Sequence, residues 1–168
     1  MAEIPKKLTN FNFYLEGKNY SGLCEEVTLP KYSVKKLDYR SAGMLGPIEY
    51  NMGVEKLEAT IKLPSYERDP FSVHGISKGN DIGLIFRGAL QSFKGDESIK
   101  AVLRGCINGF DLGSMRVGED TSLTFTMWCH YFSFSRNEQI LLELDLINNV
   151  ERFGPEDRQD LIRLFIRG

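Results

Sequence analysis

Apolar and polar residues alternate with a period of two along most of the chain, the pattern of β-strands with one buried face. Residues 10–16 place Phe11, Phe13 and Leu15 on one side. A turn at 17–19 and a second apolar run over 20–29 follow. The sequence therefore predicts an opening β-hairpin.

The middle of the chain contains the longest alternating segments. Residues 54–63 predict a strand that Pro64 ends, and residues 81–93 and 98–112 predict a long hairpin connected through 94–97. Residues 118–136 predict another long strand, which Asn137 turns into a strand over 140–150. One face of the strand at 118–136 is expected to carry Leu123, Phe125, Met127, Cys129 and Tyr131.

Two segments favour helices. Residues 65–75 carry Pro70 where the first turn of a short helix tolerates proline. A C-terminal helix is predicted to begin at Pro155, with Arg163 and Arg167 in its last turn complementing the helix dipole. Its apolar face, which includes Phe165, must pack against another surface.

Residues 32–40 alternate without a clean apolar face, and a glycine-rich loop follows over 41–47. This pattern favours pairing with something other than the core of the same domain. Together the elements predict a mainly β fold, an antiparallel β-sandwich or partly rolled barrel of about seven or eight strands with one or two helices. Long strands that are apolar on both sides favour a sheet face covered by another copy of the protein.

Composition narrows the classes of function. The 168 residues are enough for a single domain with a sizeable core, and the net charge of −2 argues against general nucleic-acid binding. No apolar run is long enough for a membrane helix or a signal peptide, so we expect synthesis and retention in the cytoplasm. Cys24, Cys106 and Cys129 lie far apart and predict free thiols.

Candidate chemistry is sparse. His74 and His130 are the only histidines, and His130 and Cys129 are neighbours that point to opposite strand faces. Glu143 and Asp145 share one strand face and form a possible carboxylate pair, although a solvated acidic face is the simpler interpretation. No phosphate-binding loop with a lysine at the required spacing is present. The sequence therefore argues against an enzyme, and neither a metal nor a cofactor is expected.

Five segments are informative in combination: PKKLTNFNFYLEG (5–17), VTLPKYSVKKLDYRSAGMLGPIEYNMG (27–53), LRG (103–105), GED (118–120) and ELDLINNVERFGPEDR (143–158). In the second, TLPK is followed eight residues later by Tyr-Arg and then by a Gly-Met-x-x-Pro loop. With these segments the chain resembles the major tail tube proteins of contractile-tailed bacteriophages, the myophage tail tube family, which is related to the tubes of R-type bacteriocins. The resemblance covers nearly the whole chain.

The resemblance implies a rolled antiparallel β-fold that forms hexameric rings with a continuous inner β-barrel. The rings stack into a hollow tube inside a contractile sheath, and DNA passes through the tube across the host envelope without specific binding. The implied partners are other copies of the chain, the sheath, baseplate and tail terminator proteins, and the tape measure protein in the lumen during assembly. The implied location is the virion tail, assembled in the host bacterial cytoplasm without stable membrane insertion.

The resemblance also gives the loop a role. We expect residues 1–168 to form a single tail tube domain, with an extended inter-subunit arm at about 38–53. Candidate contacts with a neighbouring copy are Tyr39, Arg40, Gly43, Met44, Leu45 and Pro47, and candidates for the lumen are Glu143 and Asp145. Two alternatives stay open at this point: the tube of a bacteriocin or related injection system, and a small-molecule-binding β-barrel whose pocket is lined by residues 123–134.

Overall fold

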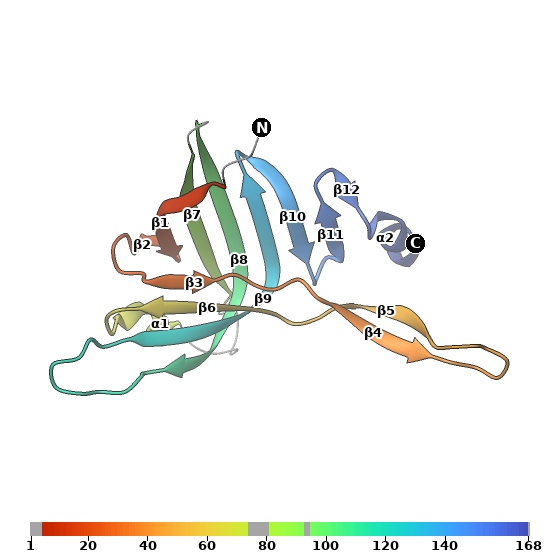
Figure 1. The fold of residues 1–168 in the computed structure, drawn as a ribbon, viewed down its shortest axis with the longest axis horizontal. Coiled ribbons are helices and arrows are strands. Elements are labelled where there is room, and N and C mark those ends of the chain that lie inside the picture. Colours follow the sequence, from red (N-terminus) through yellow and green to blue (C-terminus); the bar gives the residue numbers. More distant parts are fainter. Residues whose placement is uncertain (1–4, 74–80, 93–94, 168) are drawn as a thin grey trace.

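Strands β8 (Gly95–Asp111) and β9 (Leu123–Arg136) are the longest elements, and the main sheet is ordered around them (Figure 1). The computed structural model describes residues 5–73, 81–92 and 95–167. The other elements are β1 (Lys7–Leu15), β2 (Lys18–Asn19), β3 (Glu26–Thr28), β4 (Val34–Tyr39), β5 (Ile48–Val54), β6 (Leu57–Leu63), α1 (Arg68–Ser72), β7 (Ile82–Ser92), β10 (Gln139–Asp145), β11 (Val150–Phe153), β12 (Glu156–Asp157) and α2 (Asp160–Arg167). The main sheet has the order β12-β11-β10-β9-β8-β7-β1-β2, and β3 and β6 join it through β9.

A bend in β8 and β9 rolls this sheet over on itself. The first part of β9 pairs with β6 through residues 123–129, and the second part pairs with β10 through 131–136. Gly105 lies opposite Cys129 but Arg104 lies opposite Tyr131, so His130 forms a β-bulge. In Figure 1, β3, β6 and the first half of β9 therefore run across the steep strands of the other half. The predicted fold class, a rolled antiparallel β-fold with two helices, is confirmed.

The core fills the space between the two halves of the rolled sheet. Alternate residues of β6 are fully buried, as the pattern over 57–63 predicts. The largest fully buried side chains are Phe13, Phe125, Leu15, Leu57, Ile61, Leu63, Ile82, Leu84, Leu103, Ile107, Leu123 and Met127. Phe125 and Phe132 of β9 belong to this core.

The bulge corrects the predicted faces of β9. Leu123, Phe125, Met127 and Cys129 are buried as expected, but the prediction that Tyr131 shares their face is wrong. The extra residue at the bulge reverses the alternation, so Phe132 enters the core and Tyr131 points to the opposite face. The strand also begins at Leu123 and not at residue 118.

The opening hairpin is shorter than predicted. Glu16 and Gly17, both with positive φ, form the turn, and only Lys18 and Asn19 return along β1. The predicted return strand over 20–29 is wrong, because the chain turns away after the buried Tyr20 and crosses to the other half of the sheet. There β3 pairs with β6.

Two more boundaries differ from the prediction. The strand predicted over 54–63 is split into the end of β5 and β6, which begins at Leu57. Most of β5, residues 48–54, lies in the segment expected to be the inter-subunit arm, where no strand was predicted after the loop at 41–47. The C-terminal helix begins at Asp160 and not at Pro155, because Gly154, with φ of 59°, turns the chain so that β12 pairs with β11.

The helix predicted over 65–75 is confirmed in a shorter form as α1, and Gly75 lies outside the described residues. The long hairpin is confirmed as β7 and β8, with Ser92 opposite Gly95, so residues 95–97 belong to the strand. Phe93 and Lys94 of its predicted connection lie outside the described residues.

The bend has a steric requirement at Gly105. A Cβ atom there would lie 1.8 Å from the carbonyl oxygen of Trp128, whereas a Cβ at Gly109 meets no atom within 4 Å. We expect Gly105→Ala to lower the free energy of unfolding in urea by about 3 kcal/mol or to prevent folding, since backbone must move to admit the methyl group. Gly109→Ala is the matched control and should change it by less than about 1 kcal/mol. Equal effects of the two substitutions would contradict this account of the bend.

Candidate functional site

Strands β4 and β5 form a separate two-stranded antiparallel sheet that projects from the body of the molecule (Figure 1). We call residues 34–54 the arm. Direct pairing places Leu37 beside Tyr50 and Tyr39 beside Ile48. Paired residues share a face, so these four side chains form one apolar face of the arm. The sequence favours pairing of residues 32–40 with something other than the core of the same domain, and the separate sheet of β4 and β5 agrees with this expectation.

The two faces of the arm differ in polarity. On the other face, Lys36 lies opposite Asn51 and Asp38 opposite Glu49, and Lys36 forms an ion pair of 2.5 Å with Glu49. Much of the apolar face is open to water, since Leu37 is 53% exposed and Tyr50 is 51% exposed. An amphipathic sheet whose apolar face lies in water is a surface for another molecule.

The six predicted contact residues lie together at the outer end of the arm. Tyr39 belongs to the apolar face and makes an edge-to-face contact with Tyr50, with ring centroids 6.0 Å apart. In the tip loop, residues 40–47, Gly43 has φ of 88°, a conformation that favours glycine. Leu45 is fully exposed, and the side chain of Met44 folds back toward the backbone of Ser41. Arg40 and Pro47 are also exposed.

A buried carboxylate fixes the root of the arm. Glu151 of β11 is 5% exposed; it accepts a hydrogen bond of 2.5 Å from the Tyr32 hydroxyl and one of 2.7 Å from the Gln159 amide. Burial, together with the bond to Glu151, raises the pKa of Tyr32 to about 12. Tyr32 also packs edge-on against Phe153. Glu151 therefore connects the start of the arm to the segment that leads into α2.

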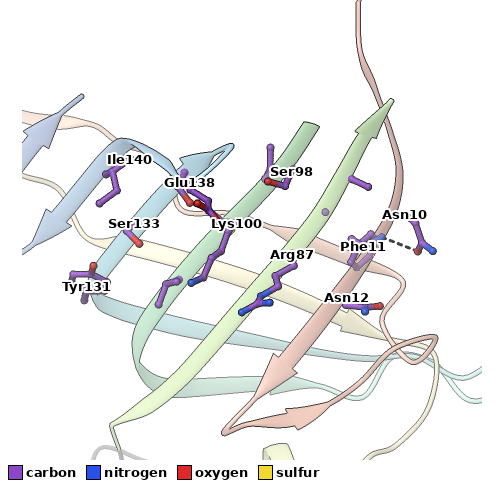
Figure 2. A pocket seen from close by; sticks show the side chains of 15 residues that line it. Asn10, Phe11, Asn12, Arg87, Ser98, Lys100, Tyr131, Ser133, Glu138 and Ile140 are labelled. Atoms are coloured by element: carbon purple, nitrogen blue, oxygen red, sulfur yellow. Dashed lines mark hydrogen bonds between the residues drawn. The ribbon is translucent and has the colours of Figure 1, made fainter. Parts of the chain in front are cut away.

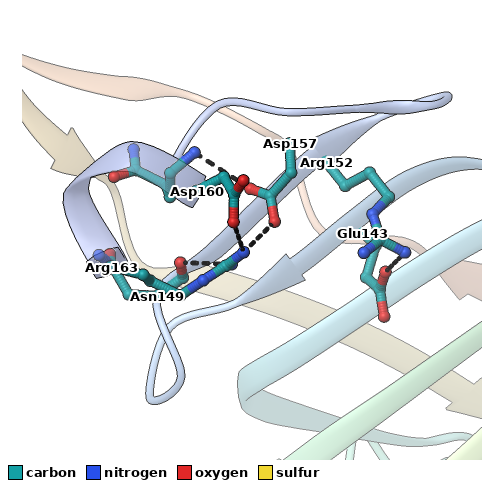
Figure 3. Close-up of polar contacts among 7 residues, drawn as sticks. Glu143, Asn149, Arg152, Asp157, Asp160 and Arg163 are labelled. Atoms are coloured by element: carbon teal, nitrogen blue, oxygen red, sulfur yellow. Dashed lines mark hydrogen bonds and ion pairs between the residues drawn. The ribbon is translucent and has the colours of Figure 1, made fainter. Parts of the chain in front are cut away.

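The C-terminal segment is held by a second polar cluster (Figure 3). Arg163 of α2 donates hydrogen bonds to Asp157 at 2.6 Å, to Asp160 at 3.0 Å and to the Asn149 carbonyl at 3.1 Å. Burial raises the pKa of Asp157, but hydrogen bonds from Arg163 and the Gln159 backbone outweigh it and hold that pKa below its usual value. Arg163 of α2 thus faces the protein, whereas the side chain of Asp160 is 77% exposed.

The lumen candidates lie on the polar outer face of the rolled sheet. Glu143 is opposite Ser133 and Asp145 opposite Tyr131, so both carboxylates share one face, as predicted. They do not form one site, because Glu143 pairs with Arg152 at 3.1 Å while Asp145 accepts hydrogen bonds from Asn148. Burial raises the pKa of Asp145, and the bonds from Asn148 outweigh this and lower it.

The same polar face contains a shallow hollow of about 820 Å³ (Figure 2). Its labelled side chains include Arg87 and Lys100 from β7 and β8 and Ser133 from β9. The face therefore carries both signs of charge, with basic residues on β7 and β8 and the two carboxylates on β10.

Other candidate chemistry is absent from the residues that the structure describes. His130 lies 2.8 Å from Asp81, and His74 is outside the described residues. Among residues 5–73, 81–92 and 95–167, no group of three or more histidine, cysteine, aspartate or glutamate side chains could hold a metal ion. The helices within these ranges are too short to cross a membrane. Cys24, Cys106 and Cys129 are free thiols.

Sequence reasoning missed half of the arm. Ile48, Tyr50 and Met52 alternate with Glu49 and Asn51, which is a strand signal with a period of two. Gly46 and Gly53, which flank this segment, made the strand signal hard to recognise. The apolar face of the arm appears only when β5 is paired with β4.

Comparisons with known proteins agree on one class. The family model described as "Phage tail tube protein FII" matches residues 5–166. The chain is 29% identical over 160 residues to the tail tube protein of Escherichia phage P2, covering 92% of this chain and 93% of that protein. It is 31% identical over 151 residues to the major tail tube protein of Serratia phage KSP20, covering 86% and 85%.

A solved structure shares the fold. The sheath/tube terminator of an extracellular contractile injection system superposes with a TM-score of 0.62 at 10% identity, covering 80% of this chain and 99% of that one.

The arm root gives a testable prediction. Tyr32→Phe removes a hydrogen bond to the buried Glu151 carboxylate, and we expect it to lower the free energy of unfolding by about 1–3 kcal/mol in urea titrations. Tyr50→Phe makes the same chemical change on an exposed ring and should have an effect below about 0.5 kcal/mol. If the two variants were equally stable, Glu151 would not be the anchor of the arm.

Proposed function

The chain belongs to the phage tail tube protein FII family, and on this basis we propose that it forms hexameric rings that stack, through the arm, into the conduit for DNA delivery. The protein is a structural subunit of a phage tail tube and not an enzyme. The observation that carries the proposal is the exposed apolar face of the arm. A single copy leaves this face in water, and a neighbouring copy covers it.

The energetics favour contact through this face. Leu37, Tyr39 and Tyr50 each keep about half of their residue surface exposed, at 53%, 49% and 51%. Burying the rest contributes about 1 kcal/mol for each residue. Tyrosine is enriched at the centre of protein interfaces because it adds a large apolar area and a polar group at low entropic cost. The arm thus supplies contact residues, and Arg40, Gly43, Met44, Leu45 and Pro47 extend the contact at the tip.

The open edge of β1 supports joining of sheets within a ring. Strand β2 pairs only with Tyr14 and Leu15, and the Phe13 carbonyl accepts a hydrogen bond from the Tyr20 N–H, which leaves the backbone of residues 7–12 without a strand partner on that side among the described residues. An unpaired edge is a template for a strand of another chain. Six copies joined in this way close the continuous inner β-barrel and remove the edge.

We assign the polar outer face of the rolled sheet to the lumen, with Glu143 and Asp145 among its lining residues. Because the face mixes acidic and basic side chains, and Arg152 balances Glu143, it offers no uniform positive surface to hold a polyanion. DNA would then pass without specific binding, and the tape measure protein would occupy the lumen during assembly. The outer surface of the tube faces the sheath, and baseplate and terminator proteins close its two ends in the virion tail. Assembly takes place in the host cytoplasm.

Deletion of the arm tip tests the proposal. Removing residues 43–47 should leave a monomer of unchanged thermal stability, because the tip touches no part of the core, while tubes seen by negative-stain electron microscopy should be lost. Lys36→Gln on the polar face of the arm is the control and should still form tubes. Tubes of normal length and number from the deletion variant would refute a role of the arm in stacking.

A further inference from the structure

Helix α2 is turned with its apolar side to solvent. Arg163 faces the protein, and its side chain is only 17% exposed because of its bonds to Asp157 and Asn149 (Figure 3). The opposite side presents Leu161, Leu164 and Phe165, which are 67%, 69% and 78% exposed. Surface helices of globular proteins normally place these two sides the other way round.

This orientation is fixed by the chain and is not the result of a loose terminus. Eight residues are too few for a stable isolated helix, so the contacts of Arg163 hold α2 in place. Gln159, immediately before α2, is in turn bound to the buried Glu151. The protein thus positions an apolar surface of two helical turns outward, and such a surface indicates a partner.

The uncharged side chains on the outward side of α2 favour an apolar partner surface over a charged one. Its outward side chains Leu161, Leu164 and Phe165 carry no charge, so a charged partner surface would lose hydration there without gaining an ion pair. In the same chain, residues 41–47 of the arm tip, Ser-Ala-Gly-Met-Leu-Gly-Pro, also lack any charged side chain, and Leu45 there is fully exposed. Apart from the charged Arg40 at the start of the tip loop, the two surfaces therefore match in polarity.

Stoichiometry and size also fit a contact between copies. Every copy carries one arm tip and one α2, so a repeating assembly covers both surfaces in all copies except those at its ends. An eight-residue helix is about 12 Å long, a length that a seven-residue loop can span. Within one copy the arm extends past α2 and its tip lies away from the helix (Figure 1), so the tip does not reach its own α2.

We propose that the outward face of α2, formed by Leu161, Leu164 and Phe165, is the receptor for the arm tip of another copy, with Leu45 as the inserted side chain. This inference rests on the proposed tube function and adds to it the surface that the arm contacts. The buried Glu151, which binds both Tyr32 at the arm root and Gln159 before α2, fixes the donor and receptor surfaces of each copy relative to one another.

Charge substitution at both surfaces tests the contact. Leu45→Glu and Phe165→Lys should each reduce tube formation about tenfold or more by electron microscopy, because each places a charge in an apolar contact. The double variant should recover much of the loss, and this recovery should fall in high salt, which screens the new ion pair. Both positions are exposed, so circular dichroism and thermal unfolding of the variants should match the unmodified protein.

The matched control is the like-charged pair, Leu45→Glu with Phe165→Glu, which should not recover. Normal tubes from Phe165→Lys alone would overturn the inference and leave the tube function intact. Two inactive single variants with no recovery in the oppositely charged double variant would also overturn it, because the effects would then be independent. If the unmodified protein formed no tubes at any concentration, the proposed function would fail first.

Discussion

The bend in β8 and β9 is the constraint on which the rest of the structure depends. Because Gly105 allows the backbone of Trp128 to approach closely and His130 bulges out, one pair of strands serves both halves of the rolled sheet. The inner sides of the two halves then enclose one core, and the outer side of one half is left polar. Removing the bend would separate β6 from the strands that it faces across the core.

A single copy is complete in its core but incomplete at its surface. The arm and α2 both place apolar side chains in water, and both are held in defined positions by buried polar contacts of Glu151 and Arg163. Buried ionic and hydrogen-bonded groups often add little net stability compared with apolar packing. Their role here is geometric: they orient the two surfaces for which we propose contact with other copies.

The sequence predicts the parts of the fold where one pattern dominates. Strands β6, β7 and β8 alternate clearly or form a long hairpin, so the existence of all three and the pairing of β7 with β8 could be predicted. The phase of β9 beyond His130 could not, because a bulge depends on the partner strand. The orientation of α2 could not be predicted either. Amphipathicity shows that a helix has an apolar and a polar side, but the hydrogen bonds of Arg163 to Asp157 and Asn149 determine which side faces the protein. The six candidate contact residues lie together at the outer end of the arm, and their contact with another copy stays a prediction; the strand of Ile48 and Tyr50 was missed.

The central claim is that another copy covers the arm, and amide hydrogen exchange of assembled and dispersed protein measures this directly. The account predicts that exchange in residues 34–54 slows strongly on assembly, while exchange in the core strands β7 and β8, already protected within one copy, changes little. Equal exchange of residues 34–54 in the two states would contradict the account, because the arm would then be as exposed in the tube as in the single subunit.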